Sequence, residues 1–259
     1  MSRAAAPRCA AGEATPKLQL LLDLQWSDQP SLDNFEPGAN GMVLRALREL
    51  LSGADGAERA LYLWGAQASG KTHLLRAACA AAQAAGHAAW LLGPQSPPSH
   101  WPSLEDVAQA GRAGLLAVDD VQGCSAWQQQ VLFGLYNAAR QSGCGFLAAA
   151  DRAPAALPLR DDLRTRMAWG LGLALQPLDD DAKQRVLARI AATHGLQLRD
   201  DLSRYILDHH ARDMASLVDL LRRLDAYALR HGRGASIPLL RTMLSESAAE
   251  SPTEPAAQP

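Results

Sequence analysis

The sequence predicts an α/β domain built on a parallel sheet, followed by a small all-helical domain. Three observations lead to this prediction. Short apolar segments alternate with helical segments as far as about residue 176, a pattern typical of a parallel sheet covered on both faces by helices. One apolar segment runs directly into a glycine-rich stretch that fits a phosphate-binding loop. Beyond that point only helical patterns remain.

The individual elements follow from the apolar spacing. Strands are expected where short apolar runs lie between turn signals, at 60–64, 88–92, 115–118 and 146–150. Helices are expected where apolar residues recur every three or four positions, at 42–51, 72–85, 127–141, 179–193, 200–209, 213–231 and 236–245. Gly86 should end the second of these helices, and the proline-rich stretch GPQSPPSHWPS should form a loop.

These patterns divide the chain into five parts. We expect a disordered leader at 1–17, a short peptide with a linker at 18–29, the α/β domain at 30–176, the helical lid domain at 177–245 and a disordered tail at 246–259. The leader combines alanines with positive charge but lacks the apolar centre of a signal peptide. The tail lacks large apolar residues.

Composition narrows the class of protein. The 259 residues carry a formal net charge of −2, which disfavours nucleic-acid binding across the whole surface, because such binding needs an excess of Lys and Arg. No stretch approaches the ~18 apolar residues of a membrane span, so no membrane partner is expected. The four cysteines are scattered without a C-x-x-C pair, as in a reduced cytoplasmic protein with buried thiols.

The stretch GAQASGKTHLL at 65–75 fits the pattern G-x-x-x-x-G-K-[ST], with an expected strand before it and an expected helix after it. Glycines let backbone N–H groups turn toward a phosphate, and the positive N-terminal end of the helix faces the same anion. Lys71 should reach the β- and γ-phosphates, and Thr72 should hold Mg²⁺. The predicted nucleotide-binding residues in this stretch are Gly65, Ser69, Gly70, Lys71, Thr72 and His73. The alternative is a chance glycine turn before a helix.

Two further strands end in acidic residues. The segment LLAVDD ends in Asp119, predicted to bind Mg²⁺, and in Asp120, predicted to orient or deprotonate an attacking water. Alternatively, both carboxylates cap the helix that follows. The next strand ends in Asp151, a position from which a side chain could sense the γ-phosphate.

Arg166, in the stretch LRTRMAWG, comes just before the sheet domain ends. A cation at this position could reach the nucleotide of a neighbouring subunit as an arginine finger. From spacing alone, a surface arginine with ordinary salt partners explains the residue as well.

Several segments together resemble one family. LDNFEPGAN, GAQASGKTHLLRAA, LLAVDDVQ, ADRAP and DLRTRMAWGL occur in the order of the AAA+ core of the bacterial replication initiator DnaA. With the helical end, the resemblance covers residues 30–245. DnaA carries a C-terminal helix-turn-helix domain and a large N-terminal domain, and neither is expected here. A DnaA core without these domains resembles Hda, the DnaA-homologous regulatory inactivator.

The resemblance gives a meaning to the segment QLLLDL at 19–24. Hda proteins carry a short motif of the pattern Q-L-x-L-x-L that binds the sliding clamp, the β subunit of DNA polymerase III. The matching residues are Gln19, Leu20, Leu22 and Leu24. An extended peptide would place alternate leucines in an apolar groove while Gln19 supplies a polar anchor. The alternative is an edge strand or helix packed on the core.

The resemblance also implies a function. Nucleotide-bound Hda docks on the DNA-loaded clamp, and its arginine finger, here Arg166, helps DnaA hydrolyse ATP. The implied ligands are ADP or ATP with Mg²⁺. The implied partners are DnaA, the clamp, DNA through the clamp, and further copies of the chain. DnaA-type lids carry an arginine that touches the nucleotide. That position is Ala215 here, and Arg212 could substitute for it, so weak or no intrinsic ATPase activity is expected.

Two other functions remain open at this point. The chain could be an AAA+ ATPase that loads a replicative helicase, resembling DnaC, a hypothesis that Asp120 and Asp151 keep open. The clamp-binding pattern favours the regulator, because a helicase loader needs no clamp peptide. A stand-alone DNA-binding relative of DnaA is the third possibility, and the slightly acidic balance and the missing helix-turn-helix count against it.

Overall fold

The α/β domain is built around one parallel sheet. The computed structural model describes residues 29–210 and 213–249 of the chain. Its sheet has five strands in the order β2-β3-β4-β1-β5, and every pairing is parallel. The strands are β1 (Ala60–Trp64), β2 (Ala89–Leu92), β3 (Leu115–Val118), β4 (Gly145–Ala150) and β5 (Leu171–Ala174).

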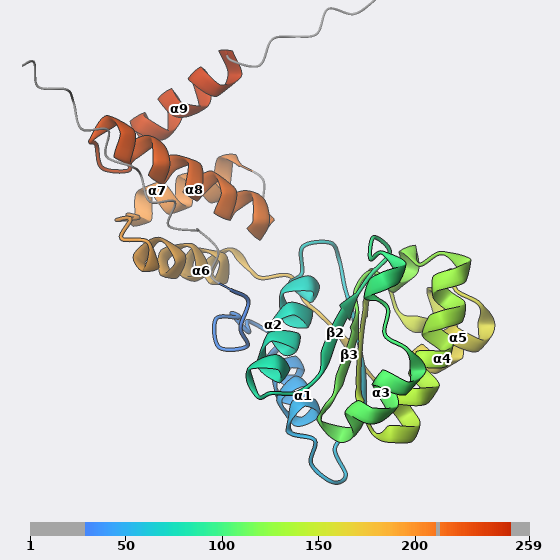
Figure 1. Ribbon diagram of the computed structural model, residues 1–259. Helices are drawn as coiled ribbons and strands as arrows, with labels where there is room; N and C mark the ends of the chain where they lie inside the picture. The colour runs from blue at the N-terminus through green and yellow to red at the C-terminus, as the bar shows by residue number, and fades with distance from the viewer. Residues whose placement is uncertain (1–28, 211–212, 250–259) are drawn as a thin grey trace, which may run out of the picture.

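Helices cover both faces of this sheet (Figure 1). One face is covered by α1 (Gly41–Ser52) and α2 (Lys71–Ala84), and the other by α3 (Leu104–Ala110), α4 (Ala126–Ser142) and α5 (Asp161–Met167). Successive side chains of β1 point to opposite faces of the sheet. Leu61 and Leu63 pack with the residues of α1 and α2, whereas Tyr62 packs with those of α3, α4 and α5. Short 3₁₀ turns lie at Pro98–His100, Gly111–Ala113, Val121–Gly123 and Pro154–Ala156.

The central strands are apolar throughout because both of their faces are covered. Every residue of β3 and β4 is buried. Parallel strands enclosed in this way form continuous apolar runs in the sequence, in contrast to the alternation of half-exposed strands. The run Ala148–Ala150 in β4 also keeps side chains small where the strand approaches the phosphate loop.

The lid has its own core. It consists of α6 (Asp180–Thr193), α7 (Asp200–His209), α8 (Met214–His231) and α9 (Ile237–Ala249), which pack around a separate leucine-rich cluster. Asp179 and Asp213 cap α6 and α8, since each carboxylate accepts a hydrogen bond from a backbone N–H three residues on. Within the described ranges, no helix is long and apolar enough to cross a membrane.

The prediction of a parallel α/β domain followed by a helical lid is confirmed, and the structure contains three further elements that were not predicted. Each expected strand and helix occurs within a residue or so of its predicted bounds, except that α9 continues to Ala249, four residues into the predicted tail. The sequence patterns do not predict β5, α3 or α5. These elements have four, seven and seven residues, too few for a periodic signal. The edge strand β5 is also exposed at Leu171 and Gly172.

One half-buried arginine joins three segments at the end of the sheet where the strands begin. The guanidinium of Arg59 donates to the backbone carbonyls of Leu50 in the last turn of α1, of Gly143 after α4 and of Arg112 after α3. Two of these carbonyls belong to helix C-terminal ends, where carbonyls lack partners inside the helix. A fixed positive charge therefore stabilises the base of the domain from both faces of the sheet.

We expect Arg59→Met to lower the free energy of unfolding by about 2 kcal/mol, because charge-assisted hydrogen bonds to three carbonyls are lost while the apolar stem is kept. Urea denaturation measures the change. Arg112→Met is the matched control: this side chain forms an exposed ion pair with Asp55 and should contribute little. Equal losses in the two variants would contradict the role given to Arg59.

Candidate functional site

Three chain segments leave the sheet at the same edge. Trp64 of β1 pairs with Ala150 of β4, and Val118 of β3 pairs with Ala148, so these strands end side by side. The residues that follow, beginning with Gly65 and Asp119, therefore meet at this edge. Carboxyl ends of parallel strands are the usual position of ligand sites in open α/β sheets.

The backbone of the phosphate loop requires its glycines. Gly70 has φ +98°, and a Cβ atom there would lie 2.9 Å from the ring of Phe35. A Cβ atom on Gly65 would lie 2.5 Å from the carbonyl oxygen of Leu175. Ala68 also adopts a left-handed conformation, with φ +61°. Two left-handed residues this close together turn successive N–H groups toward one point, which makes a concave anion site at the start of α2.

Lys71 is buried inside this loop. Its Nζ donates to the carbonyl oxygens of Gly65 and Ala66, both at 2.8 Å, and lies 3.5 Å from Oγ of Ser69. Burial lowers the pKa of Lys71, and the carboxylates of Asp120, Asp119 and Asp151 act in the opposite direction. The ammonium group is thus held at the loop by neutral carbonyls, from which a phosphate can attract it.

Thr72 and Asp119 come together as predicted. The Thr72 hydroxyl donates to Oδ2 of Asp119 at 2.6 Å. A hydroxyl and a carboxylate oxygen are ligands that Mg²⁺ accepts, with phosphate oxygens and water completing the octahedron. Among the described residues, no group of three or more His, Cys, Asp or Glu could hold a metal alone. The donor set therefore fits Mg²⁺ carried by a nucleotide.

The two other predicted carboxylates lie at the same edge with different partners. Asp120 is exposed, has φ +48°, and accepts a hydrogen bond from Gln122 at 3.1 Å. Asp151 accepts two hydrogen bonds from Arg152, at 2.8 and 2.6 Å, and this guanidinium lowers the pKa of the carboxyl. The roles of Asp120 in water activation and of Asp151 as a γ-phosphate sensor stay predictions.

The segment before α1 covers the phosphate loop. The Phe35 ring lies 5.7 Å from the His73 ring, and Nε2 of His73 donates to the carbonyl of Ser31 at 3.2 Å. Burial is the main cause that lowers the pKa of His73, so the imidazole is held neutral. His73 thus contacts the covering segment, which the motif alone does not indicate.

The same segment is tied to the lid. Glu36 forms ion pairs with Arg185 at 3.0 Å and with Arg189 at 3.6 Å, both on α6. Asn40 is buried at 3% exposure, and its side chain exchanges two hydrogen bonds with the backbone of Gln176, at 2.9 and 2.8 Å. The sequence patterns miss these contacts, because the only local signal is an asparagine before a helix.

Several predicted residues cannot be placed in the site. Arg212 and the four clamp-pattern residues, Gln19, Leu20, Leu22 and Leu24, lie outside the described residues. Ala215 is the second residue of α8 and is exposed. A methyl group at this position can supply no hydrogen bond to a nucleotide, so the expectation of weak intrinsic hydrolysis stays a prediction.

Arg166 lies away from the phosphate loop. It lies in the last turn of α5 beside Ala60, Leu61 and Gly170, at the end of the sheet where β1 begins. The phosphate loop follows the other end of β1, about 13 Å along the strand at ~3.3 Å per residue. An arginine side chain does not span that distance, so Arg166 lies outside the phosphate-loop site of its own chain, and its role as an arginine finger stays a prediction.

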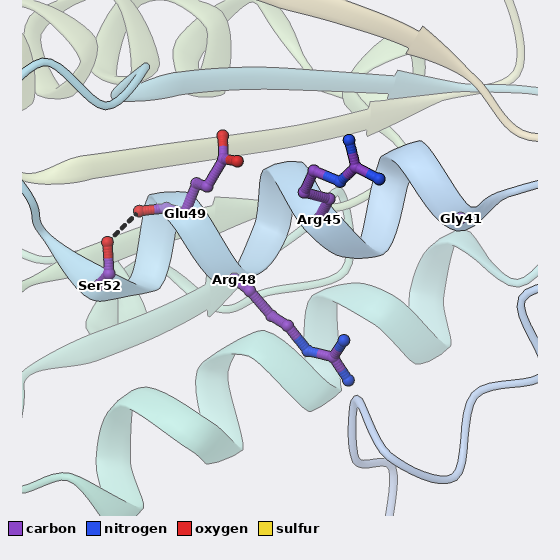
Figure 2. Close-up of a pocket in the computed structure, with 5 residues that line it drawn as sticks. All are labelled: Gly41, Arg45, Arg48, Glu49 and Ser52. Carbon is purple, nitrogen blue, oxygen red and sulfur yellow. Dashed lines mark hydrogen bonds between the residues drawn. The ribbon is translucent and has the colours of Figure 1, made fainter.

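A hollow of about 420 Å³ lies on the exposed face of α1 and is separate from this site. Figure 2 shows its lining residues, which follow one stripe of the helix: Gly41, Arg45, Arg48, Glu49 and Ser52. Arg48 pairs with Asp33 at 3.3 Å, and the Ser52 hydroxyl donates to the carbonyl of Glu49. No phosphate-loop residue lines this hollow, so its size does not make it the nucleotide site.

We expect Ala68→Gly to raise the free energy of unfolding by about 0.5–1 kcal/mol. A left-handed conformation costs a residue with a Cβ atom about 1–2 kcal/mol, and the greater freedom of glycine in the unfolded chain offsets part of the gain. Urea denaturation measures the change in stability. The affinity for nucleotide should be unchanged or improved in the variant. A loss of stability would show that Ala68 is not strained.

We expect Lys71→Ala to weaken ADP and ATP binding at least about tenfold, the effect of losing ~1.4 kcal/mol, because the loop loses its only side-chain cation. Isothermal titration of the folded variant measures the affinity. Lys183→Ala, which removes a lysine paired with Asp180 in the lid, is the control and should bind normally. Unchanged affinity in the Lys71 variant would show that this loop does not bind the phosphates of the nucleotide.

Comparison with known proteins agrees with this geometry. A family model described as the lid domain of Hda matches residues 180–244, which begin with α6. Domain III of the Thermotoga maritima replication initiation protein DnaA is similar at a TM-score of 0.72 and 20% identity, over 85% of this chain and 97% of that one. AMPPCP-bound DnaA from Aquifex aeolicus has a TM-score of 0.65 and 20% identity, over 87% and 71%. The Thermotoga maritima branch migration motor RuvB has a TM-score of 0.65 and 16% identity, over 86% and 73%.

The structural similarities extend over the sheet domain and the lid together, and at these identities they establish the fold. The family model adds the type of lid. The match to the family model begins at residue 180, the first residue of α6, which is also where the helical domain begins. The chain therefore has the fold of DnaA domain III, and its residues 180–244 match the lid domain of Hda.

Proposed function

We propose that this chain is a negative regulator of replication initiation that acts in the cytoplasm. It binds ADP or ATP with Mg²⁺, docks on the DNA-loaded sliding clamp, and stimulates ATP hydrolysis by DnaA. The Hda-type lid and the DnaA-type fold support a DnaA-related regulator. Two DnaA structures of this fold are bound to AMPPCP, which supports an adenine nucleotide in the loop formed by Gly65 to Thr72.

The observation that carries the proposal is the state of Arg166. The neighbouring arginines Arg152, Arg160 and Arg164 each form an ion pair with a carboxylate. Within the part of the chain that the structure describes, Arg166 has no carboxylate within 4.0 Å. A charged group without a salt partner, at the end of the sheet remote from its own nucleotide site, is suited to a nucleotide bound by another protein.

The proposed mechanism places the chemistry in the partner. As the bond to the γ-phosphate of DnaA-bound ATP breaks, negative charge spreads over the phosphoryl oxygens, and the guanidinium of Arg166 stabilises that charge. The nucleotide held by Lys71 and Thr72 has a different purpose: it fixes the lid against the sheet domain. Turnover of that nucleotide is not required, in agreement with Ala215 at the lid position.

Docking on the clamp would raise the local concentration of the regulator beside DnaA on DNA. We expect replacement of Gln19 and Leu20 by Ala to abolish clamp binding while nucleotide affinity and melting temperature stay nearly unchanged, because we propose that this segment is a peptide for the clamp and not part of the core. Surface plasmon resonance on immobilised clamp measures binding. A large loss of thermal stability with clamp binding retained would show that the segment belongs to the core.

We expect Arg166→Ala to remove most of the stimulation of DnaA hydrolysis, since arginine fingers in other systems contribute about 10³-fold or more. Arg166→Lys should restore little, because a point charge does not reproduce the planar guanidinium. The assay is single-turnover hydrolysis of ATP preloaded on DnaA, with clamp-loaded DNA present. Arg164→Ala, which breaks only the exposed pair with Asp161, should stimulate like the parent.

The same assay distinguishes the regulator from its main alternative. If Arg166→Ala stimulates as well as the parent, Arg166 is not the finger. If the parent chain does not stimulate DnaA at all and instead binds a replicative helicase in a pull-down, the helicase-loader function replaces the one proposed here.

A further inference from the structure

We propose that the exposed face of the lid helix α8 binds the phosphate backbone of duplex DNA through four arginines, Arg222, Arg223, Arg230 and Arg233. We call these four residues the basic stripe. The proposed function brings the chain to DNA only through the clamp, whereas this contact is made by the chain itself.

The charge of this segment is opposite to that of the chain. Residues 222–233 contain four arginines and one aspartate, a formal charge of +3, whereas the whole chain carries −2. The remaining residues therefore carry −5, and a polyanion would be repelled by most of the protein. A nucleic acid can approach favourably from a side that presents a local positive charge, and residues 222–233 supply one.

The basic stripe follows the side of α8 that faces solvent. The opposite side of the helix is buried in the lid core through Leu217, Leu220, Leu221, Leu224 and Ala228. Arg222, Arg223 and Arg230 are all exposed, and so is the small Ala226 between them. Arg223 and Arg230 are about 10.5 Å apart along the axis at 1.5 Å per residue. This is close to the ~12 Å width of the major groove, so the two guanidinium groups can reach phosphates on both sides of one groove.

The first two arginines have weak partners within the lid. Arg222 pairs with Asp219 at 2.7 Å, and both side chains are at least half exposed, so the pair contributes little. Nη2 of Arg223 donates to the hydroxyl of Ser247 at 3.0 Å, which leaves its charge without a neutralising partner. A phosphate can therefore compete for both guanidinium groups.

The other two arginines are available to an anion. Within residues 29–210 and 213–249, the side chains of Arg230 and Arg233 form no hydrogen bond and no ion pair. Gly232 ends α8 with φ +60°, and the N–H of Arg233 donates to the carbonyl of Ala228 at 3.0 Å, which holds Arg233 at the last turn. This end of α8 lies on the side of the lid away from the sheet domain (Figure 1), where DNA can approach it.

The helix dipole explains only half of the basic stripe. Cations near the C-terminal end of a helix are stabilised by its carbonyl groups, which accounts for Arg230 and Arg233. That effect falls off within the last turn. Arg222 and Arg223 lie about two turns earlier, so the dipole does not account for them. A row of cations along the helix matches instead the regular row of phosphates in DNA.

Duplex DNA fits this surface better than other polyanions do. Single strands stack their bases on exposed aromatic rings. The nearby ring of Tyr227 is half-buried, lies 4.2 Å from the His231 ring, and its hydroxyl donates to Glu246. A membrane surface requires an apolar helix face. The apolar face of α8 lies in the lid core, and Leu229 is the one large apolar side chain of this helix that is exposed.

The test is fluorescence anisotropy of a labelled duplex of about 30 base pairs, titrated with the full chain in the absence of clamp and DnaA. We expect a Kd on the order of 10⁻⁵ M at about 50 mM salt. Neutralisation of three phosphates, by Arg223, Arg230 and Arg233, should give a slope of about −2.7 in a plot of log affinity against log salt. An increase to about 200 mM salt should therefore weaken binding about 40-fold.

Arg230→Gln combined with Arg233→Gln should reduce the steepness of this slope by about 1.8 and weaken binding at least about tenfold at low salt, because two phosphate contacts are lost. The matched control combines Arg199→Gln with Arg204→Gln. It removes the same charge from exposed arginines elsewhere in the lid and should change the affinity by less than about twofold. Both double variants should melt like the parent, because all four side chains are exposed.

Several results would overturn this role. The parent chain fails to bind the duplex at low salt, or the two double variants lose the same affinity, which would indicate a general effect of charge. Tighter binding to a single strand, or to phosphatidylcholine vesicles with about 30% phosphatidylserine, would assign the basic stripe to another anion. Normal duplex binding by Arg230→Gln/Arg233→Gln with lost stimulation of DnaA would assign it to a protein. The DNA titrations contain neither clamp nor DnaA, so they succeed or fail independently of the proposed function.

Discussion

Parallel pairing of β3, β4 and β1 is the constraint on which the rest of the molecule depends. Parallel strands all end at the same edge of the sheet. The phosphate loop after β1 therefore lies close to the carboxylates after β3 and β4, although these segments are far apart in the sequence. The 2.6 Å hydrogen bond between Thr72 and Asp119 is a direct result. Arg59 and Arg166 lie at the opposite end of the sheet, where the strands begin, and are therefore remote from the phosphate loop.

The lid depends on a second, smaller constraint. The buried side chain of Asn40 pairs with the backbone of Gln176 as a neighbouring strand would, and so fixes the point where the chain leaves the sheet for α6. Glu36 then holds the first lid helix through two arginines, while Phe35, beside it, covers the loop at Gly70. One short segment before α1 thus links the phosphate loop to the lid. A nucleotide bound between them would be sensed by both domains.

Much of this could be predicted because the signals are local. Gly65, Lys71 and Thr72 lie within eight positions of one another, and the apolar runs of β1 and β3 directly precede the residues that carry the chemistry. The rest could not be predicted, since it depends on distant partners. Asn40 and its partner Gln176 are 136 residues apart, and Asn137 lies 29 residues from Arg166, from which it accepts a hydrogen bond. No spacing rule indicates such pairs, and β5 is too short to show a period.

The two ends of β1 differ: the phosphate loop follows one end, and Arg166, which has no carboxylate partner among the described residues, lies beside the other. If copies associated head to tail, the Arg166 of each would be used by the next copy, and only the terminal molecule would present a free one. The number of available fingers would then equal the number of stacks, whatever their length. Under such association, a higher concentration of the protein would lengthen the stacks, so the number of activating ends would rise more slowly than the concentration of the protein.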